Sequence, residues 1–191
     1  MTIRYGEKWG KPISIPEDTP VATTDREVAS LYSQGHSVIR LDGGDVHRVF
    51  GQPARRADCD LWGFPMDVAW FDSDLGRQVF VAHLLVGMRR GIPEIALMNS
   101  GFYGEWELAP RGHINDGRLE VVSLSIPRAD RREFRRRVVS GSHVPHPGIE
   151  IRSVKKWQGS AHGKVLVDGV ALRLHGDLSV EIEPDALTIV V

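Results

Sequence analysis

Residues 108–122 read LAPRGHINDGRLEVV, in which an Ala-Pro step and an Asn-Asp-Gly sequence precede an apolar run. Asn, Asp and Gly all tolerate the backbone angles of tight turns, so residues 115–117 predict a turn that opens a strand. The strand is expected over residues 118–127 and ends at Pro127, because proline cannot donate a ladder hydrogen bond. This turn and strand are the first indication that the second half of the chain is mainly β.

Further strand signals recur about every ten residues from about residue 58 onward. They fall in residues 67–88 (strand, turn, strand), 92–100, 148–158, 163–174 and 178–191. Within them, Ile149, Ile151 and Val154 are expected to face inward, and Asp168-Gly169 is expected at the tip of a hairpin. Short strands at regular spacing predict a mainly β, two-layer β-sandwich.

Two helices are expected beside the strands. Residues 23–35 (TTDREVASLYSQG) have Thr24 as a cap, Glu27 three residues beyond it, and Gly35 as a stop. Residues 130–141 (DRREFRRRVVSG) predict a short helix closed by Gly141, with Phe134 and Val138 as its apolar stripe. We therefore predict a β-sandwich with one or two flanking helices and a short N-terminal α/β remnant. The expected regions are residues 1–56 (extended segment, helix, strand) and 57–191 (sandwich).

Composition narrows the class of protein. The 191 residues include 25 acidic and 24 basic ones, and this near balance does not call for nucleic acid as a partner. A lone Cys59 cannot form an internal disulfide, and it has no neighbouring His to activate it as a nucleophile. No apolar stretch has the length of a signal peptide core or a membrane span. These features lead us to expect a cytoplasmic protein.

Asp116 has two interpretations. On local pattern alone, a plain turn residue is favoured. The functional alternative is a general base, since a carboxylate at the mouth of a cleft can take a proton from a substrate hydroxyl. Glu120 is a second acid four residues on, and we expect it on the solvent face of its strand.

Three other motifs resemble ligand sites but are incomplete. His143 and His146 could both reach a metal, but no nearby Cys or acid completes a set, so a rigid loop and no metal are expected. Residues 71–76 (FDSDLG) resemble the start of a calcium loop without its later acid, and a hairpin turn is expected there. Gly43, Gly44 and Asp45 resemble a phosphate-binding loop with too few backbone donors.

The arginine run of residues 128–137 (RADRREFRRR) is favoured as a solvated helix face. The alternative is contact with an anionic membrane surface through Arg131, Arg132, Arg135 and Arg136. Each basic residue near such a surface contributes about 1 kcal/mol.

Residues 57–191 resemble the C-terminal domain of the bacterial diacylglycerol kinase and related lipid kinase family. The stretches that carry the resemblance are ALMNSGFYGEWELAPRGHINDGRLEVVSL (96–124), SGSHVPHPGIEI (140–151), VLVDGV (165–170) and EIEPDALTIVV (181–191). They match the family's Ala-Pro and Asp-Gly steps, its Gly-x-His loop, its Val-x-Val-Asp-Gly hairpin, and a final strand pair around a Pro-x-Ala-Leu turn. The resemblance implies that Asp116 occupies the place of the base that activates a lipid hydroxyl.

The first residues depart from that family. Its nucleotide domain carries Gly-Gly-Asp-Gly-Thr, of which Gly43, Gly44 and Asp45 alone are present. Residues 15–46 are more similar to the helix and strand that end this domain, so most of the ATP-binding domain is expected to be missing.

Three functions stay open at this point. The first is an active lipid kinase that uses ATP and Mg²⁺, with its nucleotide site completed by another chain. The second is a non-catalytic relative that binds a lipid, a small ligand or a partner protein, and the third is a structural or regulatory module. The sequence favours the second and third, and a homodimer is expected.

Overall fold

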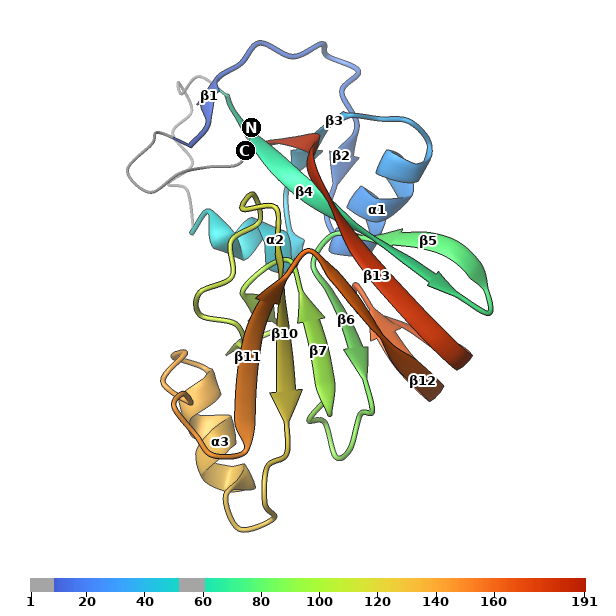
Figure 1. Ribbon diagram of the computed structural model, residues 1–191. Helices are drawn as coiled ribbons and strands as arrows, with labels where there is room; N and C mark the ends of the chain where they lie inside the picture. The colour runs from blue at the N-terminus through green and yellow to red at the C-terminus, as the bar shows by residue number, and fades with distance from the viewer. Residues whose placement is uncertain (1–8, 52–60) are drawn as a thin grey trace.

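A computed structural model describes residues 9–51 and 61–191 of the chain (Figure 1). The fold is mainly β, with 48% of residues in strands and 13% in helices. One large, mostly antiparallel sheet joins eleven strands, and its main path runs β1-β4-β13-β12-β6-β7-β10-β11. The predicted mainly β fold is confirmed.

The elements have the following bounds. The strands of the large sheet are β1 (Lys11–Pro12), β2 (Val21–Ala22), β3 (Val38–Leu41), β4 (Trp62–Ser73), β5 (Gly76–Phe80), β6 (His83–Val86), β7 (Ile95–Met98), β10 (Leu119–Leu124), β11 (Ile149–Val154), β12 (Lys156–Val167) and β13 (Val170–Val190). A separate two-stranded hairpin consists of β8 (Phe102–Tyr103) and β9 (Trp106–Glu107). The helices are α1 (Asp25–Ser33), α2 (Gly44–Val49) and α3 (Arg131–Val138).

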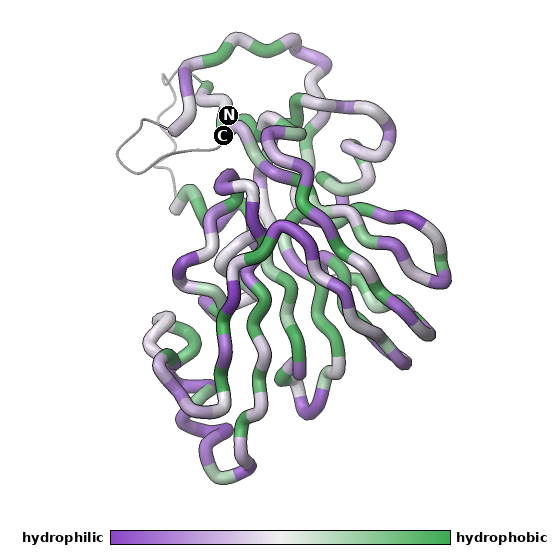
Figure 2. The backbone as a smooth tube through the Cα atoms, viewed as in Figure 1, coloured by the Kyte–Doolittle hydropathy of each residue, from purple (hydrophilic) through white to green (hydrophobic). Residues whose placement is uncertain are grey.

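The sheet folds over on itself to form two layers. Strands β5, β4, β13 and β12 form one layer, and β6, β7, β10 and β11 form the other. Between them lies an apolar cluster from both layers that includes Phe71, Phe80, Leu97, Leu119 and Leu178. Fully burying a side chain of this size contributes about 1.5–3 kcal/mol. Figure 2 shows hydrophobic residues along β6, β7 and β10 and hydrophilic ones at the turns.

The N-terminal segment adds parallel strands to this antiparallel sheet. Strand β3 pairs in parallel with the end of β13, where Val38 lies opposite Thr188, and β2 pairs in parallel with β3. Val28 and Ile39 pack with Met66 and Leu187 in a second apolar cluster. The boundary expected between residues 56 and 57 lies outside the described residues, as does Cys59.

The two expected helices form with the contacts that their sequences indicate. At the start of α1, the Thr24 hydroxyl accepts the amide proton of Glu27 at 3.2 Å, and the Glu27 carboxylate accepts that of Thr23 at 2.7 Å. In α3, Phe134 and Val138 are buried in a third apolar cluster on the outer face of β7 and β10. The arginines of α3 remain at its surface.

Three features differ from the sequence-based expectation. Helix α2 was not expected, because it has only six residues and begins at a Gly-Gly pair. Residues 148–158 form two strands that break at Lys155, so Val154 faces the core between the layers while Ile149 and Ile151 pack on the outer cluster. The expected final strand pair is one strand, β13, with a register shift between Glu183 and Leu187.

The hairpin between β12 and β13 turns at Asp168-Gly169, as predicted. Both residues have positive φ angles, 46° and 77°. The Asp168 side chain does more than turn the chain, because it accepts the backbone amide protons of Val81 (2.9 Å), Ala82 (2.9 Å) and His83 (3.1 Å). Burial raises the pKa of Asp168 to about 7, against the lowering effect of these three bonds. The carboxylate thus fastens the hairpin to the link between β5 and β6.

Asp168→Asn is expected to lower the free energy of unfolding by about 1–3 kcal/mol at pH 8, where the wild-type carboxylate is ionised. An amide has one accepting oxygen, so its NH₂ group would face at least one buried backbone donor. Urea denaturation monitored by circular dichroism measures the change. Asp74→Asn, at the exposed turn between β4 and β5, is the matched control. Equal stability of the two variants would contradict this role of Asp168.

Candidate functional site

Asp116 lies in the segment between β7 and β10, at the turn that opens β10. Its Oδ1 accepts the backbone amide proton of Arg118 at 2.9 Å, and Gly117 has a positive φ of 69°. The predicted turn is therefore present. The Asp116 side chain is partly exposed, so one carboxylate oxygen shapes the turn while the group stays within reach of a ligand.

A fully buried Asp67 on β4 holds this turn in place. Its Oδ2 accepts the amide proton of Gly117 at 2.6 Å, and its Oδ1 accepts those of Asp185 (2.9 Å) and the Asn115 side chain (3.3 Å). The Asn115 amide also donates to Asp185 Oδ1 at 2.9 Å. Burial raises the pKa of Asp67 to about 6, although the bonds from Gly117 and Asn115 oppose the shift. Asp67 thereby joins β4, the turn before β10 and the irregular part of β13.

The electrostatic surroundings of Asp116 suit a weakly acidic carboxyl group. Burial raises its pKa to about 6, and the charges of Asp67 and Glu120 add to the rise, while the amide and charge of Arg118 oppose it. Glu120 is 8% exposed, so its expected position on the solvent face is wrong. The turn closed by the bond from the Gly112 amide to the Ala109 carbonyl covers Glu120, and a Cβ on Gly112 would lie 3.6 Å from its Cγ.

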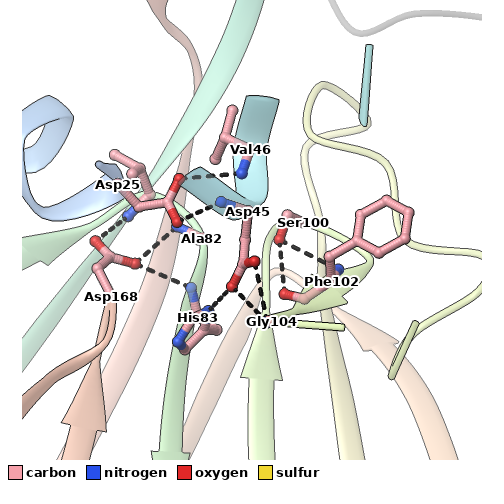
Figure 3. Close-up of polar contacts among 10 residues, drawn as sticks. Asp25, Asp45, Val46, Ala82, His83, Ser100, Phe102, Gly104 and Asp168 are labelled. Atoms are coloured by element: carbon pink, nitrogen blue, oxygen red, sulfur yellow. Dashed lines mark hydrogen bonds and ion pairs between the residues drawn. The ribbon is translucent and has the colours of Figure 1, made fainter. Parts of the chain in front are cut away.

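A second polar group surrounds Asp45 at the start of α2 (Figure 3). Its carboxylate accepts the amide proton of Gly104, with both oxygens 3.0 Å from the nitrogen, and its Oδ2 lies 3.5 Å from Nδ1 of His83. His83 is 2% exposed, and its ring makes a T-shaped contact with the ring of Tyr103. Burial lowers the pKa of His83 to about 4, so this imidazole is neutral at physiological pH.

The glycine pair at the start of α2, Gly43 and Gly44, makes room for a carboxylate of the chain itself. Asp25 accepts the amide protons of Asp45 (2.7 Å) and Val46 (3.0 Å), and burial raises the pKa of Asp25 to about 6. A Cβ on Gly44 would collide with Asp25 Oδ1. Because these helix amides are already bonded, the arrangement at Gly43, Gly44 and Asp45 does not favour a nucleotide phosphate.

Asn99 joins β4 to the link between β5 and β6. Its side-chain amide donates to the Asp67 carbonyl at 2.9 Å and to the Val81 carbonyl at 2.8 Å. Residues 99–118 thus contact Asp67 through Asn99 and the turn at Asn115-Gly117, and contact Asp45 through Gly104. Sequence reasoning missed Asp25, Asp67 and His83, because each lies inside a helix or strand pattern without a motif around it.

The remaining expected residues lie elsewhere. His143 contacts the Leu108 carbonyl through Nε2 at 3.2 Å, and His146 accepts the Gly148 amide proton at 3.0 Å. Within residues 9–51 and 61–191, no group of three or more His, Cys, Asp or Glu side chains is arranged to hold a metal ion. Arg131, Arg132, Arg135 and Arg136 lie on α3, beside the end of β10 that is remote from Asp116. In the described part of the chain, no helix is both long and apolar enough to cross a bilayer.

The folded-over, mostly antiparallel sheet defines a class of β domain that solved structures share. Searches of protein-family models and of curated proteins find no match. Three solved structures from Bacillus anthracis str. Sterne are similar at 14% identity, one described as a diacylglycerol kinase and two as candidate diacylglycerol kinases. They match 80%, 80% and 88% of this chain and 68%, 66% and 76% of their own, with TM-scores of 0.54, 0.55 and 0.61. This chain has a diacylglycerol kinase-like fold.

The pKa of Asp116 should respond in opposite directions to two neighbouring substitutions. Glu120→Gln removes a negative charge and is expected to lower this pKa, whereas Arg118→Gln removes a positive charge and is expected to raise it. Neither change removes the backbone amide that Asp116 bonds. The chemical shift of the Asp116 carboxyl carbon, followed by NMR as the pH is varied, measures this pKa in both variants. If the pKa changes in the same direction in both, or in neither, these charges do not act on Asp116.

Proposed function

We propose that this protein is a lipid-kinase-like protein that binds a hydroxyl-bearing lipid or small molecule at Asp116 and does not transfer phosphate by itself. One contrast carries the proposal. The Asp116 carboxylate, which would accept a hydrogen bond from a hydroxyl group, is fixed by its turn and partly exposed. By contrast, the backbone amides of Asp45 and Val46, which would bind a phosphate, are already bonded to Asp25.

The acceptor side of the proposal rests on the chemistry of Asp116. A carboxylate with a pKa of about 6 is ionised at pH 7 and accepts a hydrogen bond from a hydroxyl group. The bonds from Gly117, Asn115 and Asp185 to Asp67 fix the turn beneath it, so little ordering is needed when a ligand binds. Diacylglycerol, which the names of the similar structures suggest, carries such a hydroxyl.

The donor side supports binding over catalysis. Phosphoryl transfer needs a triphosphate and Mg²⁺ positioned in line with the acceptor oxygen. The Gly43-Gly44 pair is the candidate for that task among the described residues, and Asp25 occupies the amides of Asp45 and Val46 that follow it.

The alternative is an active lipid kinase whose nucleotide site is completed by a second copy or by another protein. Two observations favour it. A pKa near 6 also suits a general base at neutral pH. In addition, β2, β3 and the end of β13 run parallel, and among the described residues β2 pairs with β3 alone. An unpaired strand edge is a place where a strand of another chain can pair, so β2 offers an edge for a completing domain.

Ligand binding is tested by thermal shift with dioctanoylglycerol in detergent micelles. Wild type is expected to gain stability, by about 2.7 kcal/mol at a hundred times the dissociation constant. Asp116→Asn should lose this gain, and Asp177→Asn, an exposed change on β13, should keep it. In wild type the gain should increase as the pH rises through about 6, since the ionised carboxylate accepts the bond. Equal gains in wild type and Asp116→Asn would overturn the proposed ligand site.

Mg-ATP should neither stabilise the purified protein nor support phosphate transfer to dioctanoylglycerol. Transfer by the purified chain that Asp116→Asn abolishes would overturn the non-catalytic part of the proposal. If transfer appears only when a cell extract is added, and again depends on Asp116, the alternative with a separate partner is correct.

A homodimer is the simplest form in which another chain could complete the site. Sedimentation velocity at micromolar concentration should then give a species with twice the mass of one chain, which is 21.3 kDa. A single species at monomer mass would remove the second copy as the completing chain.

A further inference from the structure

Positive charge is concentrated at the end of β10 that is remote from Asp116. Residues 87–94 and 125–140 contain eight arginines and three acids, a net charge of +5, whereas the whole chain carries −1 and its remainder therefore −6. The arginines are Arg89 and Arg90 in the turn between β6 and β7, Arg128 in the turn before α3, and Arg131, Arg132, Arg135, Arg136 and Arg137 on α3. We call these two segments the basic end.

Contacts within the basic end join its two segments. The Arg135 guanidinium donates to the Arg90 carbonyl at 2.7 Å, which ties α3 to the turn between β6 and β7. In Figure 1 this turn and α3 lie at the same end of the molecule. The anchoring of Phe134 and Val138 in the outer apolar cluster holds the helix with its arginines outward. The charges are therefore displayed on a fixed surface.

Acidic neighbours neutralise only part of this charge. Glu94 pairs with Arg89 at 2.8 Å, and Glu133 pairs with Arg136 at 2.7 Å and Arg137 at 2.6 Å. Among the described residues, no carboxylate lies within ion-pair distance of the other arginines, which are Arg90, Arg128, Arg131, Arg132 and Arg135. These five guanidinium groups can meet an external anion.

A small recess lies within the basic end. It has a volume of about 150 Å³, and Arg89, Arg131, Ser125 and Glu94 line it together with apolar side chains such as Ile92. A water molecule occupies about 30 Å³ in the liquid, so the recess has room for a tetrahedral oxyanion. Because Glu94 is paired with Arg89, Arg131 is the cation of the lining without a carboxylate partner.

We propose that the basic end docks on an anionic phospholipid bilayer, with a lipid phosphate in the recess beside Arg131. Guanidinium groups bind phosphate oxygens through paired hydrogen bonds, and several on one surface add their attraction to a charged membrane. Val139, at the end of α3, is 51% exposed and adds an apolar side chain among the arginines. Surfaces that bind at the boundary between head groups and acyl chains combine these two features.

Docking in this orientation leaves Asp116 away from the bilayer. Strand β10 leads from the turn at Asp116 toward α3, and its six residues span about 20 Å. The bilayer therefore does not deliver the Asp116 ligand directly, and attachment is independent of the proposed function.

Vesicle flotation tests the proposal with full-length protein and two vesicle types, one of phosphatidylcholine alone and one with 30% phosphatidylglycerol. Wild type is expected to float with the anionic vesicles only, and less in 0.5 M NaCl. Arg128→Glu/Arg132→Glu should weaken its partition by about 25-fold or more, since each basic residue removed accounts for about fivefold. Arg131→Gln should partition more weakly than wild type into the same vesicles with 30% phosphatidylglycerol.

Lys164→Glu/Arg173→Glu is the matched control, because these two exposed residues face each other across β12 and β13 and the charge change is the same. It should float like wild type, and so should Asp116→Asn. Equal flotation of the control and the Arg128→Glu/Arg132→Glu variant, or no flotation of wild type, would overturn the proposal. A thermal shift with glycerol 1-phosphate but no flotation would assign the recess to a free phosphate and overturn docking on a membrane. Because flotation does not use Asp116, its failure would leave the ligand proposal standing.

Discussion

The structure around the candidate site depends on one buried carboxylate, that of Asp67. Burying an ionisable group is costly unless hydrogen bonds satisfy it. Asp67 accepts hydrogen bonds from the backbone amides of Gly117 and Asp185 and from the Asn115 side chain, and these donors come from two distant parts of the chain. These bonds form only when the turn before β10 and the irregular part of β13 both lie against β4. The position of Asp116 is a consequence of that requirement.

The same device occurs at two other places. Asp168 accepts hydrogen bonds from three backbone amides at the link between β5 and β6, and Asp25 accepts two from backbone amides at the start of α2. In each case a carboxylate from one segment satisfies backbone donors that belong to no ladder. Asp116 differs from these aspartates because it accepts one local amide and stays partly exposed. Among the described aspartates whose pKa is raised by burial, Asp116 and Asp45 are the two that are partly exposed, and Asp45 accepts the amide of Gly104, 59 positions away. Asp116, whose hydrogen bond is local, is the one that we propose meets a ligand.

Local patterns predict the strands and two of the helices, but not the contacts that make the site. The alternation of apolar residues indicates β4, β5 and β10, and the Asp168-Gly169 pair indicates a turn, because these properties act over a few residues. Asp168 binds amides 85 to 87 positions away, and no local pattern carries that information. Helix α2 was missed for a similar reason, since the group that satisfies its first amides is Asp25, 20 positions earlier. Glu120 was misplaced because a turn elsewhere in the fold covers its face of the strand.

The distribution of charge decides which ligands each end can attract. Near Asp116, burial raises the pKa of this carboxyl group, and the negative charges of Asp67 and Glu120 add to the rise against the opposing charge of Arg118. An approaching triphosphate would meet these charges and would need its own cations to offset them. A neutral hydroxyl group meets no such barrier and gains a hydrogen bond to an ionised acceptor. At the other end of β10, uncompensated arginines favour anions instead. Because β10 separates the two ends by about 20 Å, more than two Debye lengths at physiological ionic strength, neither charge group cancels the other.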